Sequence, residues 1–163
     1  MRHFNFKNGM KVLMVCLGNI CRSPIAEGIL RHKATKRGLN IEVDSAGTSS
    51  FHAGNPPDLR MMITARKNGI DITDIRSRVF VKEDFRNFDL IFPMDQSNER
   101  NILSLAESDE DRQKVKLILN EIDPTSNAQV PDPYYGGDHG FQVVIDLLDK
   151  AIDKFLNRLD GQG

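Results

Sequence analysis

Residues 12–30 read VLMVCLGNICRSPIAEGIL and hold both cysteines of this 163-residue chain. The run Met10–Cys16 is apolar and is bounded by glycines, which is typical of a strand buried on both faces. The Ser-Pro pair at 23–24 offers an N-cap hydroxyl followed by a proline at the first helical position, so a helix should begin there and run to about Arg37. The stretch therefore predicts a strand, a loop and a helix.

The same alternation continues along the chain. Three more segments have the apolar pattern of strands: Asn40–Gly47, Phe88–Asp95 and Val115–Ile122. Helices are predicted in three places: Leu59–Asn68, Ser97–Ala106 and the periodic C-terminal run 141–159. Strands that alternate with helices favour a mostly parallel α/β sandwich, in which ligands bind beyond the carboxyl ends of the strands. The loop after Cys16 lies at such an end.

Composition and charge narrow the class of protein. With 39% hydrophobic residues, 28% charged residues and a net charge of −1, the chain shows no basic surplus for nucleic acid or an anionic membrane. No segment approaches the ~20 apolar residues of a membrane span, and the N-terminus lacks the apolar core of a signal peptide. Two cysteines favour a reducing, cytoplasmic setting. We expect one domain over residues 1–163, ordered from about 10 to 160, that acts as a monomer.

The loop between the first strand and the first helix has the chemistry of an anion site. Gly18 and Asn19 tolerate left-handed backbone angles, which lets successive N–H groups turn toward one centre at the start of a helix. Arg22 adds a planar fork that suits two phosphate oxygens, and the same groups would stabilise a Cys16 thiolate. No histidine or third cysteine lies near Cys16 and Cys21 in sequence, so no metal or other cofactor is predicted.

This loop resembles a known family. The segment VCLGNICRSPIAE closely resembles the phosphate-binding loop of low-molecular-weight protein tyrosine phosphatases, which has cysteine, five residues, arginine and serine. The segments VDSAGTSS, GNPPD, KEDF, FDLIFPMDQSN and DPYYGG also look like that family and follow its order. The resemblance implies a three-layer α/β/α sandwich around a four-stranded, flavodoxin-like sheet. It also implies metal-free hydrolysis of phosphotyrosine-containing proteins through a phosphocysteine.

The resemblance assigns roles to the residues that match the family. Cys16 would attack phosphorus, and Arg22 would bind the equatorial oxygens and their developing charge. Asp132 would protonate the leaving oxygen and then activate water. Ser23 would donate a hydrogen bond to the Cys16 sulfur as the sulfur departs. The residues expected to bind phosphate or substrate through this loop are Leu17, Gly18, Asn19, Ile20, Cys21 and Ser23.

Other matches concern support and redox protection. Asn19 and Ser45 resemble a pair that fixes the loop by side-chain hydrogen bonds, and Asp95 would support the site from behind. Asp74 stands near the position where some relatives have a supporting histidine. Cys21 matches a family position whose cysteine can form a reversible disulfide with the nucleophile, so the same is expected with Cys16 under peroxide.

Four residues are predicted to form the mouth of the site. Phe51, Tyr134 and Tyr135 would line a slot suited to an aromatic ring, and Phe51 and His52 fall in a loop that varies among relatives and would tune substrate choice. The alternative is that Phe51 and His52 are ordinary exposed loop residues.

Three alternative functions are considered for this loop. A thioredoxin-coupled arsenate reductase shares the loop but needs cysteines beyond Cys16 and Cys21. A protein-arginine phosphatase of the same family carries threonine where Ile20 stands, so Ile20 favours phosphotyrosine. A non-catalytic phosphoprotein-binding module would lack the nucleophile or the acid, and both Cys16 and Asp132 are present.

Overall fold

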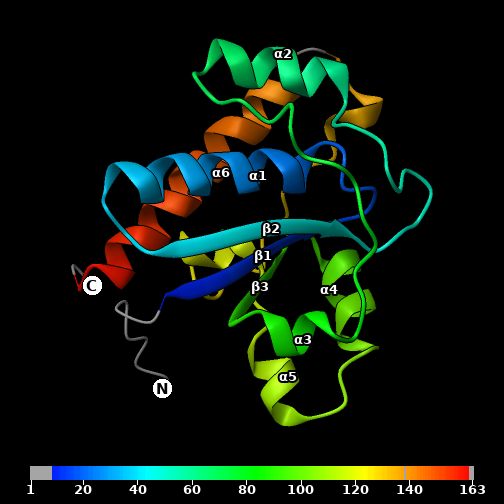
Figure 1. Ribbon diagram of the computed structural model, residues 1–163, viewed down its shortest axis with the longest axis vertical. Helices are drawn as coiled ribbons and strands as arrows, with labels where there is room; N and C mark the ends of the chain where they lie inside the picture. The colour runs from blue at the N-terminus through cyan, green and yellow to red at the C-terminus, as the bar shows by residue number, and fades with distance from the viewer. Residues whose placement is uncertain (1–8, 138, 162–163) are drawn as a thin grey trace.

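Three parallel strands form the centre of the molecule (Figure 1). The computed structural model describes residues 9–137 and 139–161; residues 1–8, which precede the predicted ordered core, lie outside that description. β1 (Met10–Cys16) lies between β2 (Ile41–Gly47) and β3 (Leu90–Pro93). All three strands point the same way, so their carboxyl ends meet at one edge of the sheet, where Cys16 is paired with Gly47.

The predicted fourth strand, Val115–Ile122, is wrong. Val115 makes a single parallel bridge to Ile91, and from Ile118 the chain turns into a short 3₁₀ helix, η2 (Ile118–Glu121). Leaving the sheet allows the consecutive residues Ile118 and Leu119 both to be buried in the core that packs against the C-terminal helix. A strand would have sent these two neighbours to opposite faces of the sheet. The periodicity of a short apolar run did not distinguish the two cases.

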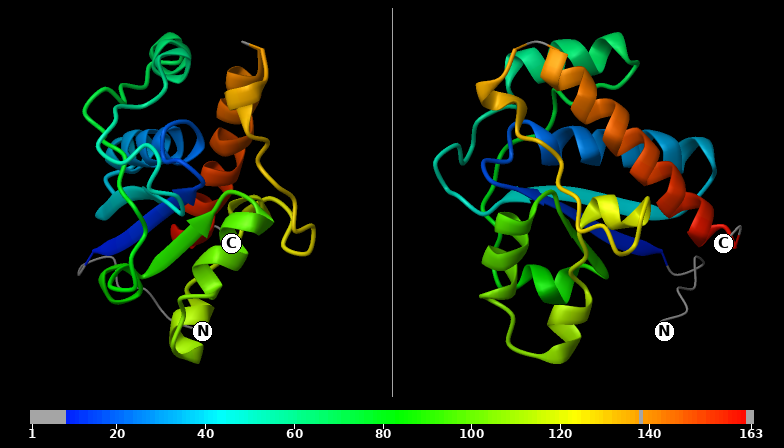
Figure 2. Two further views of the ribbon diagram at one scale, coloured as in Figure 1. Left: turned by 90° about the vertical axis from the view of Figure 1, so that its right-hand side faces the viewer. Right: turned by 180° about the vertical axis from the view of Figure 1, so that it is seen from behind.

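Helices cover both faces of the sheet, which gives the predicted three layers (Figures 1 and 2). α1 and α6 lie on one face with α2 beyond them, and α3, α4 and α5 lie on the other. The bounds of these helices are α1 Arg22–Lys36, α2 Leu59–Lys67, α3 Asp84–Asn87, α4 Gln96–Leu103, α5 Asp109–Gln113 and α6 His139–Leu159. A three-residue 3₁₀ helix, η3 (Pro133–Tyr135), precedes α6.

Alternate residues of β1 supply the two halves of the hydrophobic core. Val12 and Met14 face the layer that contains α1 and α6, whereas Leu13 and Val15 face the opposite layer. Each of these side chains is fully buried, and such burial contributes roughly 1.5–3 kcal/mol per large apolar side chain. The strand is therefore held from both sides, and Cys16 at its end is held with it.

The C-terminal helix α6 confirms the periodicity read from the sequence. Its buried residues are Phe141, Val144, Ile145, Leu148, Ala151, Ile152, Phe155 and Leu156. On its polar side, Asp149 and Asp153 each lie 2.9 Å from the Lys33 ammonium of α1. These pairs tie α6 to α1 at the surface. Among the described residues, none of the helices is both long enough and apolar enough to cross a membrane.

Candidate active site

The loop between β1 and α1 forms the floor of a cavity of about 520 Å³. Cys16 ends β1 and Arg22 begins α1, so the sheet edge and the helix N-terminus fix the two ends of the loop. The loops after β2 and around Asp132 form the walls. The cavity is lined by Cys16, Leu17, Gly18, Ile20, Cys21, Arg22, Ser49, Phe51, His52, Asp132 and Tyr134.

The Cys16 sulfur contacts the hydroxyl of Ser23, 3.0 Å away. Asn19 Nδ2 donates to the same hydroxyl oxygen at 2.8 Å, so the hydroxyl proton can point at the sulfur or at the carbonyl of Ala46, 3.4 Å away. Ser23 was predicted as the N-cap, but it lies inside the first turn of α1, and Cys21 occupies the N-cap without a capping side chain. The hydroxyl is therefore engaged with Cys16 and does not cap the helix.

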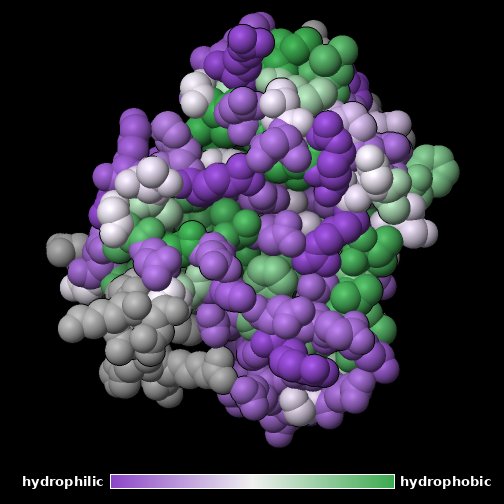
Figure 3. Space-filling model, in the orientation of Figure 1, coloured by the Kyte–Doolittle hydropathy of each residue, from purple (hydrophilic) through white to green (hydrophobic). Residues whose placement is uncertain are grey.

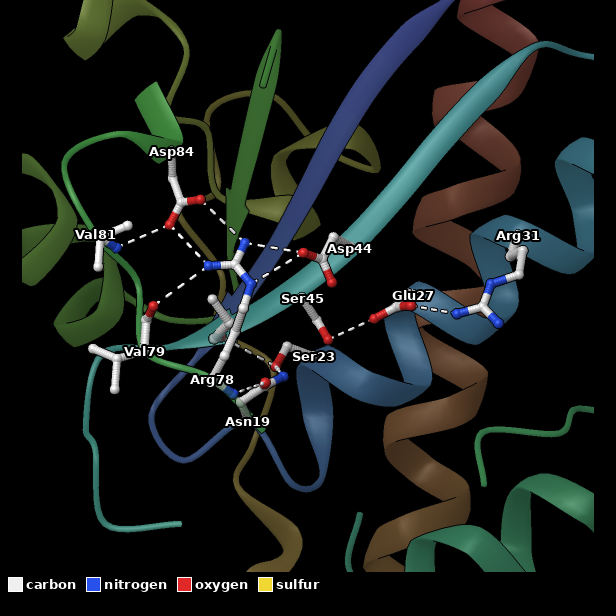
Figure 4. A network of polar contacts seen from close by, with 11 residues as sticks. Asn19, Ser23, Glu27, Arg31, Asp44, Ser45, Arg78, Val79, Val81 and Asp84 are labelled. Carbon is white, nitrogen blue, oxygen red and sulfur yellow. Dashed lines mark hydrogen bonds and ion pairs between the residues drawn. The ribbon is translucent and has the colours of Figure 1, made fainter. Parts of the chain in front are cut away.

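Asn19 determines the shape of the loop. Its φ of 54° lies in the left-handed region that asparagine tolerates better than most residues, and its side chain is fully buried. Its Oδ1 accepts a hydrogen bond from the backbone N–H of Arg78 at 3.0 Å (Figure 4). Ser77 Oγ donates to the carbonyl of Gly18 at 2.9 Å. Segment 77–78 thus fixes the loop from outside, although nothing in its own sequence indicated this role.

The guanidinium of Arg78 is itself held in place by two carboxylates. It donates to Asp44 at 3.0 Å and makes two bonds of 3.1 Å to Asp84 (Figure 4). Asp84 also accepts from the backbone N–H of Val81 at 2.9 Å. These bonds anchor the segment whose backbone contacts Asn19, so the support for the loop extends to α3.

Ser45 was expected to help fix the loop by a side-chain hydrogen bond, but the hydrogen bond of its hydroxyl is made to α1. Its hydroxyl donates to Glu27 Oε1 at 2.6 Å, and Glu27 is also bonded by Arg31 one turn further along α1 (Figure 4). Burial raises the pKa of Glu27, although the bonds from Ser45 and Arg31 act in the opposite direction. Asp74 pairs with Arg31 at 3.3 Å on the surface. The sequence analysis missed Glu27 and Arg31.

Arg22 is buried and fixed by acidic partners. Its Nη1 donates to Asp95 at 2.7 Å and to the carbonyl of Val130 at 3.1 Å, and its Nη2 lies 3.5 Å from Asp132. Burial alone would lower the pKa of Arg22, but the neighbouring Cys16, Asp95 and Asp132 raise it overall. Asp95 also accepts a bond from Asn98 N as the N-cap of α4, so one carboxylate joins the Arg22 guanidinium to the start of that helix.

Asp132 lies at the wall of the cavity, opposite the loop. Its carboxylate is one-third exposed; Oδ2 faces Arg22 and Oδ1 accepts from the backbone N–H of Tyr134 at 3.0 Å. The Asp132 side chain thereby caps η3, whose first residue is proline. The structure places this acid in the same cavity as Cys16, more than one hundred residues away in sequence.

Aromatic side chains form the mouth. Phe51 is 84% exposed and meets His52 edge to face at 4.8 Å between ring centres, and His52 lies 6.2 Å from the ring of Tyr134. The loop after β2 that carries Phe51 projects from the body of the molecule, where Figure 3 shows hydrophobic surface. Leu17 is 46% exposed in the same cavity and adds apolar surface. The side chain of Tyr135 lies outside the described residues.

Cys21 is buried in the loop between β1 and α1. Both cysteines are free thiols in this structure. Burial raises the pKa of the Cys21 thiol, and the nearby charges of Asp58 and Cys16 raise it further. The Cys21 thiol is therefore harder to ionise than an exposed one, and the Cys16 sulfur has the Ser23 hydroxyl within hydrogen-bonding distance.

This geometry defines a class: α/β proteins in which a cysteine at the end of a parallel strand shares a cavity with an arginine at the start of the next helix. The chain matches the sequence model of the family described as low molecular weight phosphotyrosine protein phosphatase over residues 11–163. It therefore belongs to that family.

Relatives and solved structures agree with this assignment. A low molecular weight phosphotyrosine protein phosphatase of Schizosaccharomyces pombe is 44% identical over 144 residues, covering 86% of this chain and 91% of the relative. A protein tyrosine phosphatase of Entamoeba histolytica superposes with a TM-score of 0.87 and 39% identity, covering 94% of this chain and 98% of the other. An arginine phosphatase of Drosophila superposes with a TM-score of 0.85 and 35% identity, covering 91% of this chain and 97% of the other.

Proposed function

We propose that this protein hydrolyses phosphotyrosine in proteins by way of a phosphocysteine, with Cys16, Arg22 and Asp132 as its catalytic residues. The observation that carries the proposal is that all three line one cavity, with the Cys16 sulfur 3.0 Å from the Ser23 hydroxyl. A nucleophile, a fixed cation and a carboxyl group in one concave site are the parts that phosphoryl transfer requires.

In the first step, the Cys16 thiolate forms a bond to phosphorus as the bond from phosphorus to the tyrosine oxygen breaks. Asp132 gives its proton to that oxygen, so the phenol leaves neutral. Proton transfer of this kind contributes about 10²–10⁴-fold to a rate. Arg22 and the loop N–H groups bind the three equatorial oxygens, whose charge must be matched in the transition state.

In the second step, water attacks the phosphocysteine. The Asp132 carboxylate takes a proton from the water, the bond from phosphorus to sulfur breaks, and inorganic phosphate forms. The electron pair returns to Cys16 as a thiolate, to which the Ser23 hydroxyl donates a hydrogen bond. Asn19 favours this role because its amide already donates to the Ser23 oxygen and orients the hydroxyl proton away from itself.

The depth of the site supports an aromatic substrate. Cys16 is only 3% exposed, so a phosphoryl group must reach it at the floor while Leu17, Phe51 and Tyr134 contact whatever carries that group. A phenyl ring has the length and the flat apolar faces for this position. Because the fly arginine phosphatase has a similar fold, phosphoarginine is the substrate that must be tested beside phosphotyrosine.

The deciding assay measures phosphate release from a phosphotyrosine peptide with EDTA present, for the wild type and for Cys16→Ser, beside a phosphoarginine protein. We expect turnover in EDTA that is lost in Cys16→Ser and that spares phosphoarginine. Preference for phosphoarginine would instead identify the protein as a protein-arginine phosphatase of the same family. Tight peptide binding without turnover in the wild type would make it a binding module instead.

We also propose that the enzyme works in the cytoplasm and that Cys21 protects its nucleophile. Peroxide would convert the Cys16 thiolate to a sulfenic acid; the Cys21 sulfur would then attack it, releasing water and forming the disulfide. Two free cysteines in one loop, both buried, support this pairing. Mass spectrometry after peroxide should find the Cys16–Cys21 disulfide, and sulfinic Cys16 beside free Cys21 would contradict it.

A further inference from the structure

Arg60, in the first turn of α2, is held on one side by a carboxylate that is attached to the phosphate-binding loop. Its Nε and Nη2 donate to the two oxygens of Asp58 at 3.1 and 2.9 Å. Asp58 is the N-cap of α2, and its backbone N–H donates to the carbonyl of Ile20 at 2.8 Å. Burial would raise the pKa of Asp58, but the bonds from Arg60 hold it below its ordinary value. The guanidinium is thus fixed relative to the loop.

On its other side, Arg60 contacts the segment that carries the acid. Nη2 donates to the carbonyl of Tyr134 at 3.2 Å, and the guanidinium lies 5.5 Å from the centre of the Tyr134 ring. It also lies 4.8 Å from the ring of Phe141, which is fully buried in the first turns of α6. The Arg60 guanidinium therefore bridges α2, the start of α6 and the turn that precedes α6.

The contact with Tyr134 leads directly to Asp132. The backbone N–H of Tyr134 donates to Asp132 Oδ1, so the position of this residue orients the carboxyl group. Asp132 is one-third exposed and two glycines follow Tyr135, so this turn has far less packing than the phosphate-binding loop. A side chain that holds Tyr134 against α2 limits where the Asp132 carboxyl group can point.

We propose that Arg60 is a positioning residue that aligns Asp132 with the leaving group by coupling the acid turn to the phosphate-binding loop. The proposal rests on the function proposed above and names a residue that the sequence analysis did not single out. Its consequence is specific. Loss of Arg60 should harm proton transfer to the leaving group and should leave attack by Cys16 largely unchanged.

The test compares two substrates that differ in leaving group. Phenyl phosphate has a basic leaving oxygen that needs the acid, whereas 4-nitrophenyl phosphate has a stabilised one that needs it less. The constant to measure is kcat/KM, because it covers the steps up to cleavage of the bond to the leaving oxygen. We expect Arg60→Ala to lower kcat/KM about tenfold for phenyl phosphate and less than about threefold for 4-nitrophenyl phosphate.

Three further comparisons separate positioning from general damage to the fold. Arg66→Ala removes an exposed arginine from the last turn of the same helix, away from the cavity lining, and should change neither substrate. In an Asp132→Asn background, Arg60→Ala should cause no further loss for phenyl phosphate, since both changes remove the same proton transfer. Arg60→Lys keeps the charge but lacks the planar guanidinium fork. It should therefore lower kcat/KM more for phenyl phosphate than for 4-nitrophenyl phosphate, but by less than Arg60→Ala does.

Equal losses on both substrates would overturn the proposal, as would a full additional loss in the Asp132→Asn background. Either result would make Arg60 a structural residue. If Arg60→Ala fails to fold in a thermal unfolding scan, the same criteria apply to Arg60→Lys. A wild-type protein that hydrolyses neither substrate would instead refute the proposed function and is recognised before any variant is made.

Discussion

The floor and the mouth of the cavity are built in opposite ways. On the floor, Asn19 and Ser23 are fully buried and Arg22 is 3% exposed. Groups from three other parts of the chain bond to them, namely the Asp95 carboxylate, the Ala46 carbonyl and the backbone N–H of Arg78. At the mouth, Phe51 is 84% exposed and Tyr134 is 38% exposed. The floor consists of polar groups that are buried and paired, whereas the mouth includes aromatic side chains that are open to solvent.

The difference matches what each region must do. Binding the charge of a transition state requires donors that do not reorganise, and burial with full pairing provides that rigidity. Binding many protein substrates requires a surface that adapts, and side chains exposed to solvent provide it. Substitutions on the floor should therefore change chemistry and stability together, whereas substitutions at the mouth should change substrate choice alone.

The largest effect is expected from Arg22→Lys. Lysine keeps the charge but cannot bond to Asp95 and Val130 and still present a planar fork to phosphate. We expect kcat/KM for a phosphotyrosine peptide to fall by about 10²–10³-fold, in the range of losing a transition-state donor. Steady-state kinetics would measure this. Activity within tenfold of wild type would show that charge suffices and that the floor need not be rigid.

Asn19 allows backbone strain to be separated from side-chain bonding. Both Asn19→Ala and Asn19→Gly lose the bonds to Ser23 and Arg78, at a cost of about 1–3 kcal/mol in the free energy of unfolding. Only alanine also suffers from the φ of 54°, which adds roughly 1–2 kcal/mol. Denaturant unfolding should rank wild type above glycine and glycine above alanine.

The same two variants also test the role of the loop in catalysis. Both should lower kcat/KM by up to about 10²-fold, because small displacements at a reacting centre have effects of that size. A glycine variant with wild-type rate and wild-type stability would mean that segment 77–78 does not fix the floor. A loss of rate without any loss of stability would equally break the link between the two properties.

The sequence predicted the floor well because its parts are adjacent in the chain. Cys16, Arg22 and Ser23 lie within eight residues, and a strand before them with a helix after them dictates how the loop must turn. The groups that hold this loop come from elsewhere. The bonds of Ser77 and Arg78 join residues 59 positions apart, and no local pattern marks them.

Two errors have the same cause, which is that a contact made in the folded chain overrode the local preference. Serine is a residue type favoured at N-caps, but the Ser23 hydroxyl lies inside the helix and contacts the Cys16 sulfur. Residues 115–122 have the composition of a strand, but Ile118 and Leu119 turn together into the core under α6. Asp132 was found only because its segment resembles a family. An Asp-Pro turn alone does not reveal the cavity that it faces.

Glu27 is a charge buried below the floor, and it should affect stability more than rate. Its folded-state pKa is raised above its ordinary value of 4.5, mainly by burial. Between those two values the native state binds more protons than the unfolded state, so the free energy of unfolding falls as pH rises through that window. Above the raised pKa, the decrease is complete and remains as a constant cost.

Glu27→Gln should remove that fall, because glutamine does not titrate and can still accept the bond from Ser45. Urea unfolding at a series of pH values above 4.5 would give the difference in stability between wild type and variant, in which all other titrating groups cancel. We expect the free energy of unfolding of the wild type to fall relative to that of the variant as pH rises, by about 1.4 kcal/mol for each unit of pKa shift. A flat difference, or one of opposite sign, would show that Arg31 fully compensates the buried charge.

The smallest effect is expected from Phe51→Ala at the mouth. Because Phe51 is 84% exposed, the free energy of unfolding should change by less than about 0.5 kcal/mol. An aromatic contact with the substrate is worth about 0.5–1.5 kcal/mol, so kcat/KM for a phosphotyrosine peptide should fall about two- to tenfold. Acetyl phosphate, which has no ring, should be hydrolysed at the wild-type rate.

Leu59→Ala is the matched control, since Leu59 is 66% exposed on α2 and does not line the cavity. It should leave both substrates unaffected. If Phe51→Ala slows acetyl phosphate as much as the peptide, the mouth takes part in shaping the floor, and rigidity and adaptability are not divided between the two regions. If it slows neither, Phe51 is an ordinary exposed loop residue, and the choice of substrate must be made by side chains closer to Cys16.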